Sequence, residues 1–293
     1  GNYTATLSGT SSAANTNTIM GDTSGNVTAT VASGTAASLV AALGNASSSD
    51  VLSLTVSDNS GSATDAADLI TLNGKTSEAI DISAISSGIS GSTAELVDIY
   101  STNAAQYTGE GNEAVTLDDT ASAANANTIM GATSGNVTAT VTATGTVSAL
   151  NTALSNASAT DALTLVLDAT SVAAADLNTL DSKTSIAINA GTIATMTGSA
   201  SAVKTALESA GISDDGGVVV TLDAGTATAT DLTDIDTVTT ATVVASAITA
   251  ISGSGAEVAA VVAGDITTGN YTATLSGTSS AANTNTIMGD TSG

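Results

Sequence analysis

Residues 122–141, SAANANTIMGATSGNVTATV, contain the two elements from which the fold of this chain is predicted. The first part opens on a serine and has the character of a short helix, whereas NVTATV at 136–141 alternates polar and apolar side chains as a half-buried strand does. Residues 12–31 repeat the whole phrase with two substitutions. A helix that leads into a strand, and recurs, indicates an α/β repeat protein.

The same alternation runs along the rest of the chain. Short runs rich in Val, Ile and Thr predict strands at 3–7, 26–31, 51–56, 78–82, 114–117, 136–141, 162–167, 185–189, 218–222 and 240–245. Between them lie segments that open on Ser, Thr or Asp and are often followed by Gly, which are capping signals of helices. Apolar pairs three or four positions apart give these helices one buried stripe: Leu39/Leu43, Leu150/Leu154, Leu177/Leu180 and Val203/Leu207.

A longer period is superimposed on this alternation. Residues 1–25 recur without a change at 269–293, so the two copies begin 268 residues apart. We expect one long period over 1–268, with 269–293 as the start of the next period and further periods beyond both ends. The period contains five strand–helix–strand–helix units, at about 1–50, 51–112, 113–160, 161–216 and 217–268. Residue 1 is Gly, which suggests an internal fragment or a processed product.

Strands joined by short helical crossovers pair in parallel. The predicted fold is therefore an α/β repeat solenoid, in which parallel strands alternate with short helices in stacked coils. A parallel β-solenoid and a series of tandem β-sandwich domains are the alternatives.

The composition excludes several classes of function. The chain has 27 acidic and 3 basic residues, a formal charge of -24, and no His, Cys or Arg. It therefore lacks the common general base, a thiol nucleophile and the cations that bind nucleic acid. The sequence contains no run of about 18 apolar residues, so it predicts no membrane span. We expect no enzyme; adjacent carboxylates such as Asp214 and Asp215 are better explained as a solvated turn.

Recurrent aspartates are the candidate metal ligands. Four lie where a unit-opening strand ends, and three more lie in the helical segment that comes next: Asp58, Asp118, Asp168 and Asp223, then Asp68, Asp176 and Asp231. If the coils stack, these carboxylates could form a calcium ladder, because hard cations prefer carboxylate oxygens. The alternative is that they form Asx-turns and helix N-caps, which use the same residues.

Three further patterns are open to a functional interpretation. The T-x-T pairs Thr4/Thr6, Thr28/Thr30 and Thr138/Thr140 could order water as ice-binding solenoids do, although Thr is simply a good strand residue. Glycan acceptors of the N-x-S/T type stand at Asn2, Asn26, Asn45, Asn136, Asn156 and Asn270. Lys75 and Lys183 occupy matching GKTS and SKTS contexts, and we expect them to lie near helix C-termini or beside surplus carboxylates.

The phrases NTIMGATSGNVTATV (127–141), GNEAVTLDDTASAANANTI (111–129) and DLNTLDSKTSIAINAGTIATMTGSASAVKTAL (176–207) resemble repeats in giant secreted surface proteins of marine bacteria, above all cyanobacteria. Those proteins are S-layer-like, motility-associated or RTX-adhesin-like. The resemblance implies an extracellular or cell-surface location, often with calcium, but the glycine-rich calcium repeat GGxGxDxUx is missing here.

The expected function is structural, with the chain forming or extending a filament, sheath or surface layer through end-to-end and lateral self-association. Its alternatives are the spacer of a large calcium-dependent adhesin and, more remotely, an ice-binding solenoid.

Overall fold

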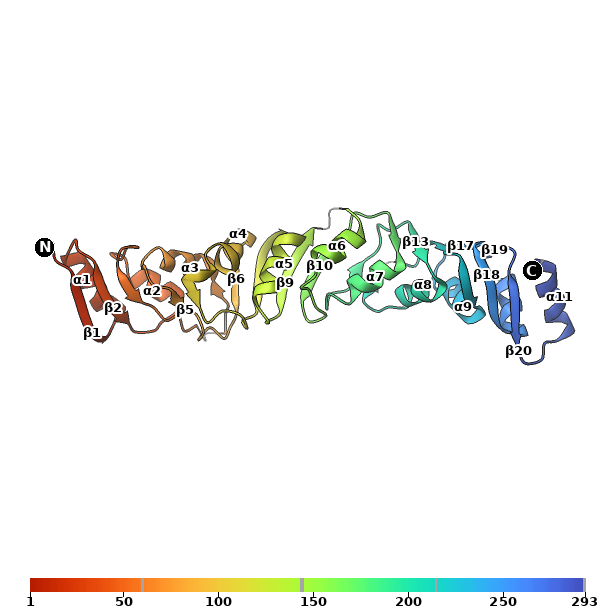
Figure 1. Cartoon of the computed structure of the whole chain (residues 1–293), viewed down its shortest axis with the longest axis horizontal. Helices are drawn as coiled ribbons and strands as arrows, with labels where there is room; N and C mark the ends of the chain where they lie inside the picture. Colours follow the sequence, from red (N-terminus) through yellow and green to blue (C-terminus); the bar gives the residue numbers. More distant parts are fainter. Residues whose placement is uncertain (59–60, 143–144, 214, 292–293) are drawn as a thin grey trace. The chain divides into compact units, whose positions relative to one another are not determined.

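The computed structural model describes residues 1–58, 61–142, 145–213 and 215–291. The chain forms two compact units, the first comprising residues 1–141 and 160–163 and the second residues 142–159 and 164–293. Figure 1 shows the succession of strands and helices in each. No helix in the described ranges is long and apolar enough to cross a membrane.

The first unit alternates strands with short helices. Its elements are β1 (Ala5–Ser11), α1 (Ala13–Asp22), β2 (Val27–Val31), α2 (Ala36–Ala42), β3 (Val51–Ser53), β4 (Thr64–Asp65), α3 (Ala66–Asn73), β5 (Ile80–Asp81), β6 (Ile89–Gly91), α4 (Thr93–Val97), a π-helix (Asp98–Thr102), a 3-10 helix (Ala104–Gln106), β7 (Tyr107–Thr108), β8 (Val115–Ser122), α5 (Ala123–Ala132) and β9 (Val137–Thr142). The strands form the sheets β1-β2-β3, β5-β7 and β4-β6-β8-β9, the last continued by β10 (Ala162–Val166), whose first two residues belong to this unit.

The second unit has the same plan. Its elements are α6 (Val147–Ala153), the remainder of β10, β11 (Ser171–Ala173), α7 (Ala174–Asp181), β12 (Ile188–Asn189), β13 (Thr195–Gly198), α8 (Ala200–Leu207), β14 (Ile212–Ser213), β15 (Val219–Leu222), β16 (Gly225–Thr228), α9 (Ala229–Val238), β17 (Val243–Ala245), β18 (Ile248–Ser254), α10 (Gly255–Ala263), β19 (Ile266–Thr268), β20 (Thr272–Ser276) and α11 (Ala281–Asp290). The sheets are β11-β13-β15-β17-β19, β12-β14 and β16-β18-β20.

The predicted parallel pairing is confirmed. β1 pairs with β2 through Ala5↔Val27, and β2 pairs with β3 through Thr28↔Val51, both in parallel. In the second unit α7, α8, α9 and α10 each link two sheets, as α9 does between β16 and β17, and each contacts the helices before and after it in the sequence. The structure is thus mixed α/β with several parallel sheets, and its helices are incompatible with the all-β alternatives.

The core is a layer of small aliphatic side chains. Strand β2 buries Val27, Ala29 and Val31 and exposes the two threonines between them, as the period-two pattern predicts. All four predicted helical pairs are buried, including Leu39/Leu43 and Leu150/Leu154. The predicted N-caps are also confirmed, since in the described part every α-helix except α7 begins at a side chain that accepts a backbone N–H: Ser12, Thr35, Asp65, Ser92, Ser122, Thr146, Ser199, Thr228, Ser254 and Ser280.

Gly is the C-cap of α3 and α10, as expected of segments that Gly often follows, but other helices end differently. Helices α1, α5, α9 and α11 end at a threonine in extended conformation. The extended backbone at this position directs the chain into the next strand, whereas a left-handed glycine would reverse it. In each case the threonine side chain has a further role.

A threonine follows every odd-numbered α-helix of the described residues, and after five of these helices it bonds to the strand start that lies one turn earlier in the chain. Its hydroxyl donates to a backbone carbonyl: Thr23 to Tyr3, Thr76 to Leu52 at 2.8 Å, Thr133 to Glu113 at 2.7 Å, Thr239 to Val218 at 2.7 Å and Thr291 to Tyr271 at 2.5 Å. Thr184, after α7, accepts from the N–H of Ile186 at 3.0 Å. We call the five residues that bond to an earlier strand the clasp threonines.

After two of the even-numbered helices, α2 and α6, a buried aspartate carboxylate takes the role that the threonine has after the odd-numbered helices. Asp50, after α2, accepts the N–H of Val27 at 2.8 Å and that of Ser47 at 2.9 Å. Asp161, after α6, accepts the N–H of Val137 at 2.8 Å. Both aspartates are only 5% exposed, so their hydrogen bonds compensate for the loss of hydration.

Replacing Thr239 by Val should destabilise the second unit by about 1–3 kcal/mol, because the carbonyl of Val218 and the N–H of Ala241 lose a buried partner. Urea unfolding measures the change. The matched control is Thr221→Val on the exposed side of β15, which should stay within about 0.5 kcal/mol of the parent. Equal effects of the two substitutions would contradict a structural role for the clasp.

Candidate functional site

The predicted metal-binding aspartates lie in different surroundings. Asp118, Asp168 and Asp223 are exposed, whereas Asp58 is buried and accepts a hydrogen bond from Thr64 Oγ1 at 3.2 Å. Asp68 and Asp176 are half-buried in the first turns of α3 and α7. Burial, and then the neighbouring charge of Asp65, raise the pKa of Asp68.

The described residues contain no group of three or more acidic side chains placed to hold a metal ion. The carboxylate of Asp223 lies on the exposed side of its turn, while its backbone N–H donates to Gly198 O at 2.8 Å. Asp214, for which the sequence predicts a solvated turn with Asp215, lies outside the described residues. Calcium binding by the seven aspartates stays a prediction.

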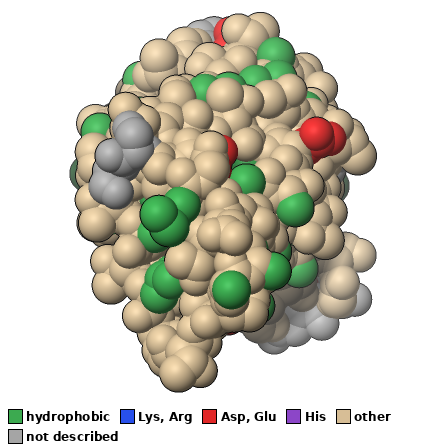
Figure 2. Space-filling model, turned by 90° about the vertical axis from the view of Figure 1, so that its right-hand side faces the viewer, with side chains coloured by type: hydrophobic (Ala, Val, Ile, Leu, Met, Phe, Trp, Pro, Cys, Tyr) green, Lys and Arg blue, Asp and Glu red, His purple; other side chains and the backbone are tan. Residues whose placement is uncertain are grey.

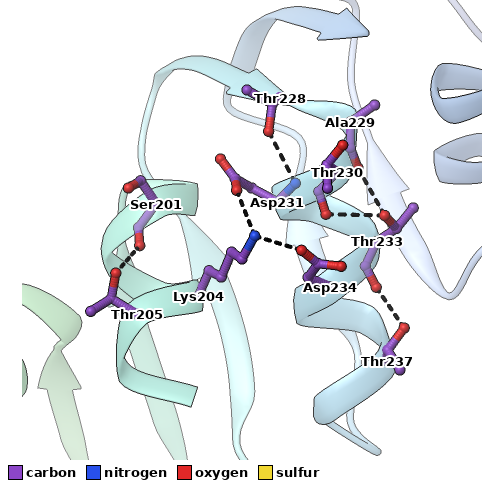
Figure 3. A network of polar contacts seen from close by, with 10 residues as sticks. All are labelled: Ser201, Lys204, Thr205, Thr228, Ala229, Thr230, Asp231, Thr233, Asp234 and Thr237. Atoms are coloured by element: carbon purple, nitrogen blue, oxygen red, sulfur yellow. Dashed lines mark hydrogen bonds and ion pairs between the residues drawn. The ribbon is translucent and has the colours of Figure 1, made fainter. Parts of the chain in front are cut away.

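Asp231, the seventh predicted ligand, lies beside a cation of the chain. Figure 3 shows Lys204 extending from α8 towards Asp231 and Asp234 on α9. Its Nζ lies 3.2 Å from Asp231 Oδ1 and 2.5 Å from Asp234 Oδ2. Hydrogen bonds to Asp234 and then to Asp231 raise the pKa of the Lys204 amine. This contact joins two successive helices through one oxygen of each carboxylate.

Lys75 and Lys183 are placed as the sequence predicts, near helix C-termini. Lys75 Nζ donates to Leu43 O at 2.9 Å, and Lys183 Nζ donates to Leu154 O at 2.9 Å. Leu43 and Leu154 are the C-caps of α2 and α6, so each lysine neutralises the end of the preceding helix.

The surface patterns are exposed but short. All six N-x-S/T asparagines are exposed, which leaves glycan attachment sterically open. The exposed T-x-T row of β2 lies beside Val51 and Ser53 of β3, so the row of threonine pairs does not continue onto that strand.

The two identical terminal copies have opposite faces exposed. Met20 is 6% exposed whereas its counterpart Met288 is 71% exposed. Conversely Tyr3 is 49% exposed, and its counterpart Tyr271 is 1% exposed. Residues 1–25 are therefore covered only by later turns of the chain, and residues 269–291 only by earlier turns.

The face beside Met288 is hollow and partly apolar. A hollow of ≈ 410 Å³ is lined by Thr272, Ala273, Leu275, Thr284, Ile287, Met288 and Thr291, and we call this surface the C-terminal face. Figure 2, a view from the side at which the C-terminus lies, shows hydrophobic side chains spread over the surface and sparse acidic ones. The edge strand of this face is β20, at the end of the β16-β18-β20 sheet.

The buried tyrosines were not singled out from the sequence. Tyr100 donates to Glu113 Oε1, while Glu113 Oε2 accepts the N–H groups of Gly111 at 2.9 Å and Asn112 at 3.0 Å. Burial, and then the bond to Glu113, raise the pKa of Tyr100. Burial likewise raises the pKa of Tyr107 and Tyr271, with the charges of Asp98 and Asp290 adding to it.

Comparison of the chain with protein-family models, with curated proteins and with solved structures finds no match.

A calcium ladder predicts that the thermal midpoint rises in calcium but not in magnesium at the same ionic strength, because only a specific ligand stabilises the folded state by linkage. The variant Asp118→Asn, at an exposed position of β8, should then lose part of the rise. Equal midpoints in the two cations would instead leave the aspartates as turn and cap residues.

The folded chain should lose stability at alkaline pH. The folded chain holds the phenol protons of Tyr100, Tyr107 and Tyr271 more tightly than the unfolded chain does. Their contribution is therefore complete below the unfolded pKa of about 10 and falls as the pH rises above it. Lys204 acts in the same direction. Urea unfolding as a function of pH should show the decline, and it should be shallower in Tyr100→Phe; an identical slope in the variant would contradict this assignment.

Proposed function

We propose that this chain is an α/β solenoid segment of an extracellular or cell-surface structural protein, and that it forms or extends a filament, sheath or surface layer. The parallel pairing of the strands supports this proposal, because β18 and β20 each pair with the strand one turn earlier in the chain. The clasp threonines join successive turns in both units. Such a repeat can be lengthened without changing its cross-section.

The single observation that carries the proposal is the opposite burial of identical residues. The sequence around Met288 is the same as that around Met20, and Met20 is covered because a further turn comes after it. The C-terminal face therefore has the chemistry of an interior surface. An exposed apolar surface next to an unpaired strand edge is a site of association.

Charge favours contacts at the ends over contacts at the sides. The chain carries a formal charge of -24, so two copies that lie side by side repel each other at low salt. The described residues lining the C-terminal face are Thr, Ala, Leu, Ile and Met, which carry no charge. We propose that ends join first, and that lateral packing needs cations to screen or bridge the acidic sides.

Sedimentation over a concentration series, with electron microscopy of the same samples, tests this function. We expect linear assemblies that lengthen with concentration, and we expect Met288→Asp to abolish them without loss of monomer stability, because the side chain is 71% exposed in the monomer. A monodisperse monomer at high concentration would contradict the proposal and favour the spacer of an adhesin.

The matched control is the same substitution at the identical residue of the first copy. Met20 is 6% exposed, so Met20→Asp should destabilise the first unit itself through burial of a charge. Equal behaviour of the two variants would show that the two copies do not differ in their surroundings.

A further inference from the structure

We propose that copies of this chain join by exchange, with residues 269–291 of one copy replacing residues 1–23 of the next on that copy's residues 26–53. This inference rests on the proposed end-to-end assembly and specifies its interface. The partner is a second copy of this chain, and the surface that it supplies is one already formed within every copy.

The exchanged interface is present between residues 1–23 and 26–53. Strand β1 pairs with β2 through Ala5↔Val27 and Ser11↔Val31. The N–H of Asn45 donates to Asn17 Oδ1 at 2.7 Å, and Asn45 Nδ2 donates to Asn17 O at 3.1 Å. Residues 269–291 contain every one of the donors and acceptors that residues 1–23 use, because the two sequences are identical.

The incoming segment is already folded in the required form. Helix α11 spans Ala281–Asp290 as α1 spans Ala13–Asp22, each beginning at a capping serine. The clasp is also the same, since Thr291 donates to Tyr271 O as Thr23 donates to Tyr3 O. Asn285, the counterpart of Asn17, is exposed, so the groups that would meet Asn45 are accessible.

The two copies are covered on opposite faces. Tyr3 is 49% exposed, whereas Tyr271 is 1% exposed because the turn before it packs against it. A segment with a neighbour on one side opens at a lower cost than one covered on both sides, and a released segment recovers conformational entropy. Exchange therefore places a copy whose Tyr271 is already buried where Met288 also becomes covered, while residues 26–53 stay covered.

The result is an open chain of copies. Each copy gives residues 269–291 to the next and receives those of the previous one, which is a heterologous contact that does not close. The C-terminal face is then covered by Val27, Leu39 and their neighbours, as the matching face of residues 1–23 is within the chain.

Cross-linking between two single-cysteine variants tests the exchange, because the chain has no cysteine of its own. One variant is Asn45→Cys and the other Asn285→Cys, mixed and treated with a short thiol–thiol cross-linker. We expect a product of twice the chain mass. A mixture of Asn285→Cys with Thr226→Cys, at an exposed site of β16, should give none.

A locked chain provides the second arm. This double variant carries Asn17→Cys and Asn45→Cys, and a reducible linker joins the two cysteines within one chain. The linker holds residues 1–23 in place, so we expect the variant not to assemble until the linker is cut. If assemblies sediment but the Asn45–Asn285 product is missing, or if the locked chain still assembles, exchange is wrong while end-to-end assembly stands. If the parent chain does not assemble at all, the proposed function fails with it.

Discussion

The hydrogen bonds of the clasp threonines are the interaction on which the rest of the structure depends. Thr76, Thr133 and Thr239 are buried, and each joins the end of a helix to the start of the strand one turn earlier. In a chain with four aromatic residues and no disulfide, these bonds act beside the parallel strand ladders to hold successive turns in register. Where the register is held, the period-two strands place their valines and leucines in one layer, and the helices cover it.

Much of the fold could be predicted because its signals are periodic. The alternation in residues 26–31 and the apolar pairs of the helices specify which side of each element is buried. Short strands such as β6 (Ile89–Gly91) and β13 (Thr195–Gly198) were missed, since two to four residues contain too few apolar side chains for a pattern. Their pairing is imposed by the neighbouring strands, which a local pattern does not show.

The polar residues that hold the turns together were harder to find. Each clasp threonine is followed by Ser or Thr, as in TSG at 23–25 and KTS at 75–77, but such pairs are common in a chain rich in Ser and Thr. Asp50 and Asp161 did leave a signal, because they end the matching phrases NASSSD (45–50) and NASATD (156–161). Of the aspartates that sequence reasoning favoured at strand ends, Asp168 and Asp223 do come after strands, whereas Asp118 lies within β8, which continues to Ser122; all three are exposed. A carboxylate that precedes a strand is within reach of backbone N–H groups, whereas one that comes after a strand can remain in water.

The two terminal copies allow a comparison within one chain, because the same residues have a neighbouring turn on one side in the first copy and on the other side in the second. The most direct measurement monitors the four methionine methyl groups by NMR in the presence of a soluble paramagnetic probe. We predict that the Met288 methyl is accessible to the probe in dilute solution and becomes protected as assemblies form. A Met288 methyl that stays accessible while the chain sediments as an assembly would contradict the claim that this face is where copies meet.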